Sequence, residues 1–231
     1  MKNFVDYDIW VPQNVEKPGC MMILDAGHGG IHNKQYTTAP YKMCDFGDFV
    51  FYEGEVNRIL VSKLAAKFKE NSIAHAFTTT SNLDESLDAR GVKIGNVVNS
   101  YPKYHHTLLS VHHNAAGESA HGTEFWTTHG INESDYAANI YFPRIYEFGL
   151  KFRINRAKEN EYDKEENWKI LRLAEKHGCS SILFEIGFFS NREEALKMLE
   201  DEFQNNVVNA LYKGTVDLIT KIKRDGTVKP A

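Results

Sequence analysis

The sequence has little cysteine. Its 231 residues include only three, Cys20, Cys44 and Cys179, which are widely spaced and form no CxxC pair. This pattern excludes a disulfide framework and a zinc site built from thiolates. It is typical of a chain made in a reducing cytoplasm with unpaired cysteines.

Long hydrophobic runs and an excess of basic residues are also lacking. The longest apolar runs, such as residues 21–24 and 182–184, are too short to cross a bilayer. A formal net charge of −4 provides no basic footprint for nucleic acid. The first twenty residues include Asp6, Asp8 and Pro12 and contain no apolar core segment, so we expect synthesis in the cytoplasm without a signal peptide.

No linker rich in proline, glycine or serine divides the chain, and the sequence contains no internal repeat. The six prolines are scattered, and apolar runs extend from residue 20 to residue 219. We therefore expect one domain over residues 20–221, preceded by an N-terminal arm over residues 1–19 and followed by a short polar tail over residues 222–231. We expect the protein to be a monomer.

Strand-like and helix-like segments alternate within this domain. Short apolar runs predict five strands, over residues 20–25, 74–80, 107–112, 122–128 and 180–186. Apolar residues at helical spacing predict three helices, over residues 53–69, 84–99 and 193–222. Pro143 is expected to interrupt a further helix that begins near Ser134. The alternation predicts an α/β fold with a mostly parallel or mixed central sheet and helices on both faces.

Three of the predicted strands end in residues capable of chemistry. His28 lies in the glycine-rich turn after the first strand, His112 ends the third, and Glu185 ends the fifth inside an apolar run. A carboxylate in such a run is costly to bury unless it is paired, bound to a metal or raised in pKa. Ligands bind at the carboxyl ends of strands in α/β sheets, so the three side chains are predicted to meet at one edge.

Histidines and carboxylates at one sheet edge favour a zinc hydrolase. Catalytic zinc takes three protein ligands from His, Asp or Glu and keeps a fourth position for water. The helix that begins at Glu53 directs its first turn toward the same edge, so Glu53 is the candidate third ligand beside His28 and His112. Such an enzyme also needs a separate carboxylate that takes a proton from water and returns it to the leaving amine.

Five sequence motifs occur in a recognisable order and spacing. They are DAGHGG at residues 25–30, EGEVN at 53–57, SVHHNA at 110–115, GTEFW at 122–126 and FEIGFFSN at 184–191. With these motifs the chain resembles the N-acetylmuramoyl-L-alanine amidase type 3 family, the zinc-dependent cell-wall amidases, over roughly residues 21–219. The resemblance implies a mixed-sheet α/β fold and hydrolysis of the amide between N-acetylmuramic acid and L-alanine in peptidoglycan.

Position by position, the resemblance implies a role for each candidate residue. His28 and His112 match the two zinc histidines of the family, and Glu53 matches its zinc glutamate, which implies one Zn²⁺ per chain. Glu185 matches the catalytic glutamate. Its implied role is to transfer a proton while water attacks the amide carbonyl.

The sequence departs from the family's pattern at three places. His113 follows the second histidine, where a small residue is usual, so two imidazoles compete for the ligand role. Successive strand residues point to opposite faces, so only one can meet the metal, and the alignment favours His112. Glu55 is close enough in sequence to compete with Glu53, although it would point away around the helix. The loop over residues 31–52 looks longer than usual, and its aromatic residues are candidates to line or cover the groove: Tyr36, Tyr41, Phe46, Phe49 and Phe51.

The resemblance also indicates a partner and a place of action. Peptidoglycan is the implied substrate, and an enzyme made without a signal peptide would reach the cell wall after release, as a bacteriolytic phage endolysin does. Two alternatives stay open: a zinc hydrolase of another amide or peptide, and a metal-free homologue that binds peptidoglycan without cleaving it. Most of the other histidines are expected at the surface or in turns: His32, His75, His105, His121, His129 and His177.

Overall fold

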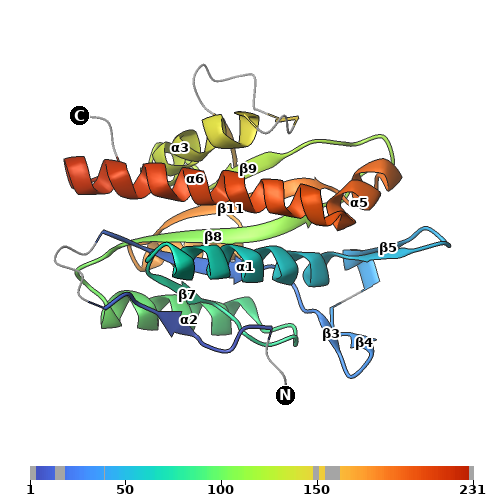
Figure 1. Ribbon diagram of the computed structural model, residues 1–231, viewed down its shortest axis with the longest axis horizontal. Helices are drawn as coiled ribbons and strands as arrows, with labels where there is room; N and C mark the ends of the chain where they lie inside the picture. Colours follow the sequence, from blue (N-terminus) through green and yellow to red (C-terminus); the bar gives the residue numbers. More distant parts are fainter. Residues whose placement is uncertain (1–3, 14–18, 39, 148–150, 154–161, 229–231) are drawn as a thin grey trace.

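A seven-stranded mixed sheet forms the centre of the structure (Figure 1). The computed structural model describes residues 4–13, 19–38, 40–147, 151–153 and 162–228. The strands lie in the order β1-β7-β2-β8-β11-β9-β10. Their bounds are β1 Ile9–Trp10, β2 Cys20–Ala26, β7 His75–Phe77, β8 His105–Asn114, β9 Glu124–Thr127, β10 Asp163–Glu165 and β11 Ser180–Phe188.

The four central strands, β7, β2, β8 and β11, run parallel to one another. At the edges, β1 pairs antiparallel with β7, β9 pairs antiparallel with β11, and β10 pairs parallel with β9. Strands β2 and β11 are buried along their whole length, as expected for apolar runs in a sheet covered on both faces. The predicted α/β fold with a mixed central sheet is confirmed.

Helices cover both faces of the sheet. Their bounds are α1 Glu53–Glu70, α2 Leu87–Ser100, α3 Glu133–Glu147, α4 Lys169–Lys176, α5 Arg192–Leu199 and α6 Asp201–Asp225. Helices α1, α3 and α6 pack on one face, and α2 and α4 pack on the other. Figure 1 shows α6 alongside α1 and α3, with α2 on the opposite side. No helix in the described part of the chain is long and apolar enough to span a membrane.

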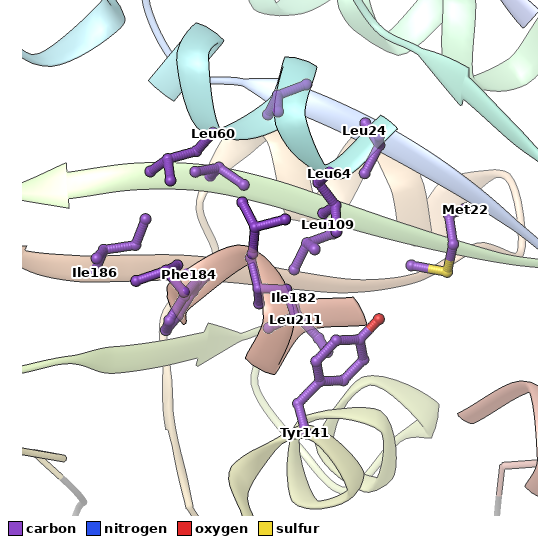
Figure 2. Packing of buried hydrophobic residues seen from close by; sticks show 14 of the residues in the cluster. Met22, Leu24, Leu60, Leu64, Leu109, Tyr141, Ile182, Phe184, Ile186 and Leu211 are labelled. Carbon is purple, nitrogen blue, oxygen red and sulfur yellow. The ribbon is translucent and has the colours of Figure 1, made fainter. Parts of the chain in front are cut away.

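The larger of the two cores lies between the sheet and the layer of α1, α3 and α6 (Figure 2). Leu60 and Leu64 lie four residues apart, so they share one face of α1, and both are buried in this core together with Leu109 of β8. Burying one leucine contributes about 1.5–3 kcal/mol. Helix α6 approaches α3 closely at Gly214, where an added Cβ would overlap the ring of Tyr141.

Two hairpins lie between β2 and α1. The first pairs β3, Ile31–His32, with β4, Gln35–Tyr36. The 3-10 helix η1, Pro40–Lys42, then leads into the second hairpin, in which β5, Met43–Asp45, pairs with β6, Val50–Tyr52. Because α1 begins at the residue after β6, the second hairpin places its chain directly at the start of that helix. Both hairpins lie at the same end of the sheet (Figure 1).

Two sequence predictions about helices are wrong. Helix α3 continues through Pro143, because Tyr141 and Ile145 on either side are fully buried and hold the helix against its neighbours despite the lost backbone hydrogen bond. The helix predicted over residues 193–222 is two helices, which are separated at Glu200, where the backbone is extended.

The described parts of both chain ends pack against the domain. In the N-terminal arm predicted over residues 1–19, Ile9–Trp10 forms the edge strand β1, and Val5 belongs to the larger core. At the other end, α6 continues beyond residue 221 to Asp225, and Val228 is buried. The prediction that His75 lies at the surface is also wrong, because β7 is buried and His75 is fully buried with it.

Candidate active site

His28, Glu53 and His112 meet near the carboxyl ends of strands β2 and β8. Each side chain offers one ligand atom, and these atoms lie within 4.8 Å of one another. Oε1 of Glu53 lies 3.3 Å from Nε2 of His28 and 3.1 Å from Nδ1 of His112. The three residues that the sequence predicts as metal ligands are therefore brought together by the fold.

Glycines make this approach possible. His28 lies in the turn after β2 with a φ of 62°, a backbone conformation that is uncommon for residues other than glycine. A Cβ at Gly27 would overlap the ring of His112, and a Cβ at Gly54 would overlap the carbonyl oxygen of Gly29. The turn can lie against β8 and the first turn of α1 only because both positions lack a side chain.

Two buried arginines hold the His28 turn. Nη2 of Arg58 donates to the carbonyl oxygen of His28 at 2.8 Å, and Nη2 of Arg90 donates to the same oxygen at 3.0 Å. Neither arginine stands out in the sequence as a residue of the site. The only local signal was a basic residue among the apolar, inward-facing positions of two predicted helices, and that signal does not reveal a backbone partner.

The buried carboxylate of Asp25 holds Arg90 in place. Asp25 forms a 2.8 Å ion pair with Arg90 and accepts hydrogen bonds from the hydroxyl groups of Ser110 and Thr78. Burial raises the pKa of Asp25, but Arg90 and the two hydroxyls outweigh it and bring the pKa to about 2. Asp25 therefore stays ionised and fixes the guanidinium that contacts His28.

The candidate ligands change one another's protonation. Burial raises the pKa of Glu53, but hydrogen bonds from His112 and His28 outweigh it and hold that pKa well below its ordinary range. Burial lowers the pKa of His28. For His112 burial is outweighed by the hydrogen bond to Glu53, so its pKa is raised. An ionised Glu53 thus lies between two imidazoles.

This donor set fits a zinc ion. Two imidazole nitrogens and one carboxylate are a ligand set of catalytic zinc sites, which leave a further position open. Oε2 of Glu53 is buried and has no hydrogen-bond partner in the described ranges of the chain. A buried carboxylate oxygen without a donor is costly, and a cation held by the three side chains would satisfy it.

The two competing residues point elsewhere. Nδ1 of His113 lies 2.7 Å from Oδ1 of Asn57, and its ring contacts Phe51. The carboxylate of Glu55 accepts a hydrogen bond from the backbone N–H of Ile31. The geometry therefore favours His112 over His113 and Glu53 over Glu55 as ligands.

Glu185 lies beside the cluster in the sheet. It is the register partner of His112 on β8 and of Glu124 on β9, so the three side chains project from the same face. Glu185 is 6% exposed, and its Oε2 has no hydrogen-bond partner among the described residues. Burial raises the pKa of Glu185 to about 8. A buried carboxyl with a raised pKa next to candidate metal ligands is suited to proton transfer.

The aromatic residues of the 31–52 loop have different environments. Phe51 is fully buried and stacks on Phe189, so it belongs to the core rather than to a groove wall. Phe46 and Phe49 stack on each other at 4.8 Å, and Tyr41 is 85% exposed. Tyr36 is partly buried against Tyr52.

Two histidines and two glutamates thus gather at one end of the mixed sheet, as a donor set that could hold a metal ion beside a further buried carboxyl. The family model described as N-acetylmuramoyl-L-alanine amidase matches residues 22–217. The chain belongs to this family of cell-wall amidases. No curated protein sequence gives a significant match.

Solved structures of amidases share the fold. The N-acetylmuramoyl-L-alanine amidase from Clostridium difficile 630 is 21% identical over 91% of this chain and 100% of that chain, with a TM-score of 0.69. The catalytic domain of CwlV from Bacillus (Paenibacillus) polymyxa var. colistinus is 19% identical over 87% and 98%, with a TM-score of 0.66. Ami1 from Mycobacterium smegmatis is 16% identical over 88% and 98%, with a TM-score of 0.69.

Proposed function

We propose that this amidase is zinc-dependent and cleaves the amide bond between N-acetylmuramic acid and L-alanine in peptidoglycan. One observation carries the proposal: the ligand atoms of His28, Glu53 and His112 lie within 4.8 Å of one another, beside the buried carboxyl of Glu185. Membership of the amidase family supports the choice of bond and substrate.

His28, Glu53 and His112 would hold one Zn²⁺. The ion supplies polarisation of the scissile carbonyl and activation of water when it is bound. Arg58 and Arg90 keep His28 in place by hydrogen bonds to its backbone carbonyl oxygen.

Glu185 supplies the acid–base group. Its carboxylate takes one proton from the attacking water, whose oxygen forms the new bond to the lactyl carbonyl carbon. Glu185 then donates that proton to the nitrogen of L-alanine as the C–N bond breaks, which leaves a free amino group and a lactyl carboxylic acid that loses its proton to solvent. Its raised pKa, caused by burial, favours the second transfer, because the protonated form is accessible near neutral pH.

Digestion of purified sacculi tests this function. The sacculi are incubated with the protein, with the protein after treatment with a chelator, and with the treated protein after zinc is restored, and the soluble products are analysed by mass spectrometry. We expect peptides with a free L-alanine amino group in the first and third samples only. Cleavage of glycosidic or cross-bridge bonds would contradict the proposed bond specificity.

A pair of variants separates loss of the metal from general damage. His28→Ala removes a proposed ligand, whereas His129→Ala removes an exposed imidazole. We expect only His28→Ala to lose both zinc and hydrolysis. Hydrolysis of free peptides with intact sacculi left untouched would favour the alternative of another amide hydrolase. Binding to sacculi without zinc and without products would favour a metal-free binding protein.

A further inference from the structure

The ammonium group of Lys42 lies close to Glu53, one of the proposed metal ligands. Its Nζ lies 3.9 Å from Oε2 of Glu53, while 43% of the Lys42 side chain is exposed and Glu53 is buried. At 3.9 Å the ammonium is beyond hydrogen-bonding distance of this carboxylate. Lys42 thus lies next to the ligand set with a side chain that remains accessible from outside the protein.

The register of the second hairpin fixes this position. The ladder ends at the pair of Met43 on β5 with Tyr52 on β6, and Lys42 directly precedes Met43 while Glu53 directly follows Tyr52. Glu53 is also the first residue of α1. The end of one hairpin therefore brings the lysine and the glutamate close to each other.

Tyr36 secures the same position from the first hairpin. Its hydroxyl donates to the backbone carbonyl of Lys42 at 2.8 Å and accepts from the backbone N–H of Gly54 at 3.1 Å. This hydroxyl therefore links Lys42 to Gly54, the residue after Glu53. Burial raises the pKa of Tyr36 to about 12, so the hydroxyl remains a donor at neutral pH.

Two threonines join this segment to the turn that carries His28. The hydroxyl of Thr38 accepts from the N–H of Gly29 at 2.6 Å, and the hydroxyl of Thr37 donates to the carbonyl of Gly30 at 2.9 Å. The described residues of this segment are thus tied to the His28 turn and, through Tyr36, to the start of α1. A segment fixed at both points holds Lys42 with little reorganisation when substrate binds.

The charge of Lys42 reaches the catalytic groups. Burial is the largest cause of the raised pKa of Glu185, and the Lys42 ammonium acts against it. Burial also lowers the pKa of His28, and the ammonium adds to that effect. The ammonium therefore acts on groups of the candidate site, in line with its place 3.9 Å from Oε2 of Glu53.

Amide hydrolysis produces negative charge on the carbonyl oxygen when water adds to the carbon. A fixed donor next to that oxygen lowers the barrier, because it interacts more strongly with the transition state than with the neutral amide. We propose that Lys42 is a catalytic residue whose ammonium donates a hydrogen bond to this developing oxyanion without transferring a proton. The inference rests on the proposed amidase function and adds a second source of positive charge to the site.

The test measures kcat and KM of the zinc-loaded protein on a soluble muropeptide that contains the N-acetylmuramoyl-L-alanine amide. Lys42→Met removes the charge and keeps most of the aliphatic stem. Lys42→Arg keeps the charge but changes its geometry. Lys34→Met removes an exposed charge from the β3–β4 turn of the same segment and is the matched control.

We expect Lys42→Met to lower kcat by about 10²–10³-fold with KM changed less than about threefold, because one oxyanion donor has an effect of this size. Lys42→Arg should recover part of the loss, and Lys34→Met should match the wild type. Zinc affinity, measured on the same preparations, should not fall in any of the three variants, and thermal stability should stay unchanged.

Three results would overturn the role of Lys42. They are a kcat of Lys42→Met within threefold of wild type, a rise in KM alone, and a loss of zinc affinity in proportion to the loss of rate. A rise in KM alone would mean that Lys42 recognises a carboxylate of the substrate in its ground state. These results are distinct from failure of the proposed function, in which the wild-type protein itself does not cleave this amide.

Discussion

Nδ1 of His113 lies 2.7 Å from Oδ1 of Asn57, and the amide nitrogen of Asn57 donates to the carbonyl of Gly27 at 3.0 Å. His113 therefore supports the turn that carries His28, although it does not join the ligand cluster. Burial lowers the pKa of His113 to about 3, so this imidazole is neutral and donates through Nδ1. The adjacent histidines of β8 have different tasks because their side chains leave the strand on opposite faces.

Separate substitutions of the two histidines should have different effects. His112→Ala should lower zinc affinity by more than about 100-fold, because changes that only affect supporting residues already reduce it by about 10–100-fold. His113→Phe should keep stoichiometric zinc but lose about 1–3 kcal/mol of stability, since Asn57 is left without its donor. Elemental analysis after dialysis and denaturant unfolding measure the two effects. Loss of zinc in His113→Phe together with retained zinc in His112→Ala would show that His113 is the ligand.

Glu185→Gln should strongly reduce turnover while zinc stays bound. The amide keeps the shape of the side chain but cannot take a proton from water, so we expect kcat to fall by about 10²–10⁴-fold. In the wild type, kcat/KM should rise with pH through the pKa of Glu185, because only the ionised carboxylate acts as the base. Burial raises this pKa, so the rise should occur closer to neutral pH than for an ordinary glutamate.

The matched control for this variant is Glu193→Gln, which changes an exposed glutamate at the start of α5. It should leave both the rate and the pH profile of the wild type unchanged. Full turnover by Glu185→Gln would remove Glu185 from the mechanism. A residual rate that still rises with pH through the same range would assign that ionisation to another group.

Much of the fold was predictable because the central strands are buried on both faces. Such strands are short apolar runs, and β2 and β11 stand out in the sequence for that reason. Strands β1 and β10 do not, since each has only two or three residues and forms by pairing with a partner distant in sequence. Helix α3 was mispredicted at Pro143 because burial against α6 depends on tertiary contacts that local propensity does not contain.

Some residues of the candidate site were likewise predictable from the sequence, and others were not. His28, His112 and Glu185 were predictable because polar residues at the ends of apolar strands are conspicuous in a sequence. Arg58 and Lys42 were not, since their positions depend on backbone carbonyls and on hairpin register. Residues that support or extend a site act through partners that only the folded chain brings together.

Arg58 should contribute to zinc affinity without contacting the metal. Its guanidinium donates to the carbonyl oxygens of Gly54, His28 and Ser81, and thereby links α1 to the His28 turn. We expect Arg58→Met to weaken zinc binding by about 10–100-fold. The carbonyl oxygen of His28 then loses one of the two arginine donors that hold this residue in its left-handed conformation. Arg58→Lys should be intermediate, since one ammonium cannot reach all three oxygens.

Competition with a chelator measures the zinc affinity of these variants. Arg172→Met, which changes an exposed arginine on α4, is the matched control and should bind zinc as the wild type does. Unchanged zinc affinity in Arg58→Met would show that Arg90 alone holds the His28 carbonyl.

His75 should make the protein less stable in mild acid. The buried imidazole contacts the rings of Tyr7, Trp10, Phe68 and Phe77, and burial lowers its pKa to about 4. In the unfolded chain a histidine titrates near pH 6.5. Between these two values the unfolded chain binds a proton that the folded protein does not. The free energy of unfolding therefore falls as the pH is lowered, by up to about 1.4 kcal/mol per pH unit from this residue.

Denaturant unfolding of wild type and His75→Phe at about pH 7 and about pH 5 tests this contribution. A phenylalanine fits the aromatic surroundings and cannot bind a proton, so His75→Phe should lose less stability on acidification than the wild type. Some pH dependence should remain, because burial also lowers the pKa of His106 to about 4. His129→Phe replaces an exposed histidine and should keep the full wild-type dependence. An equal loss of stability in His75→Phe and wild type would show that His75 is already protonated in the folded protein at the lower pH.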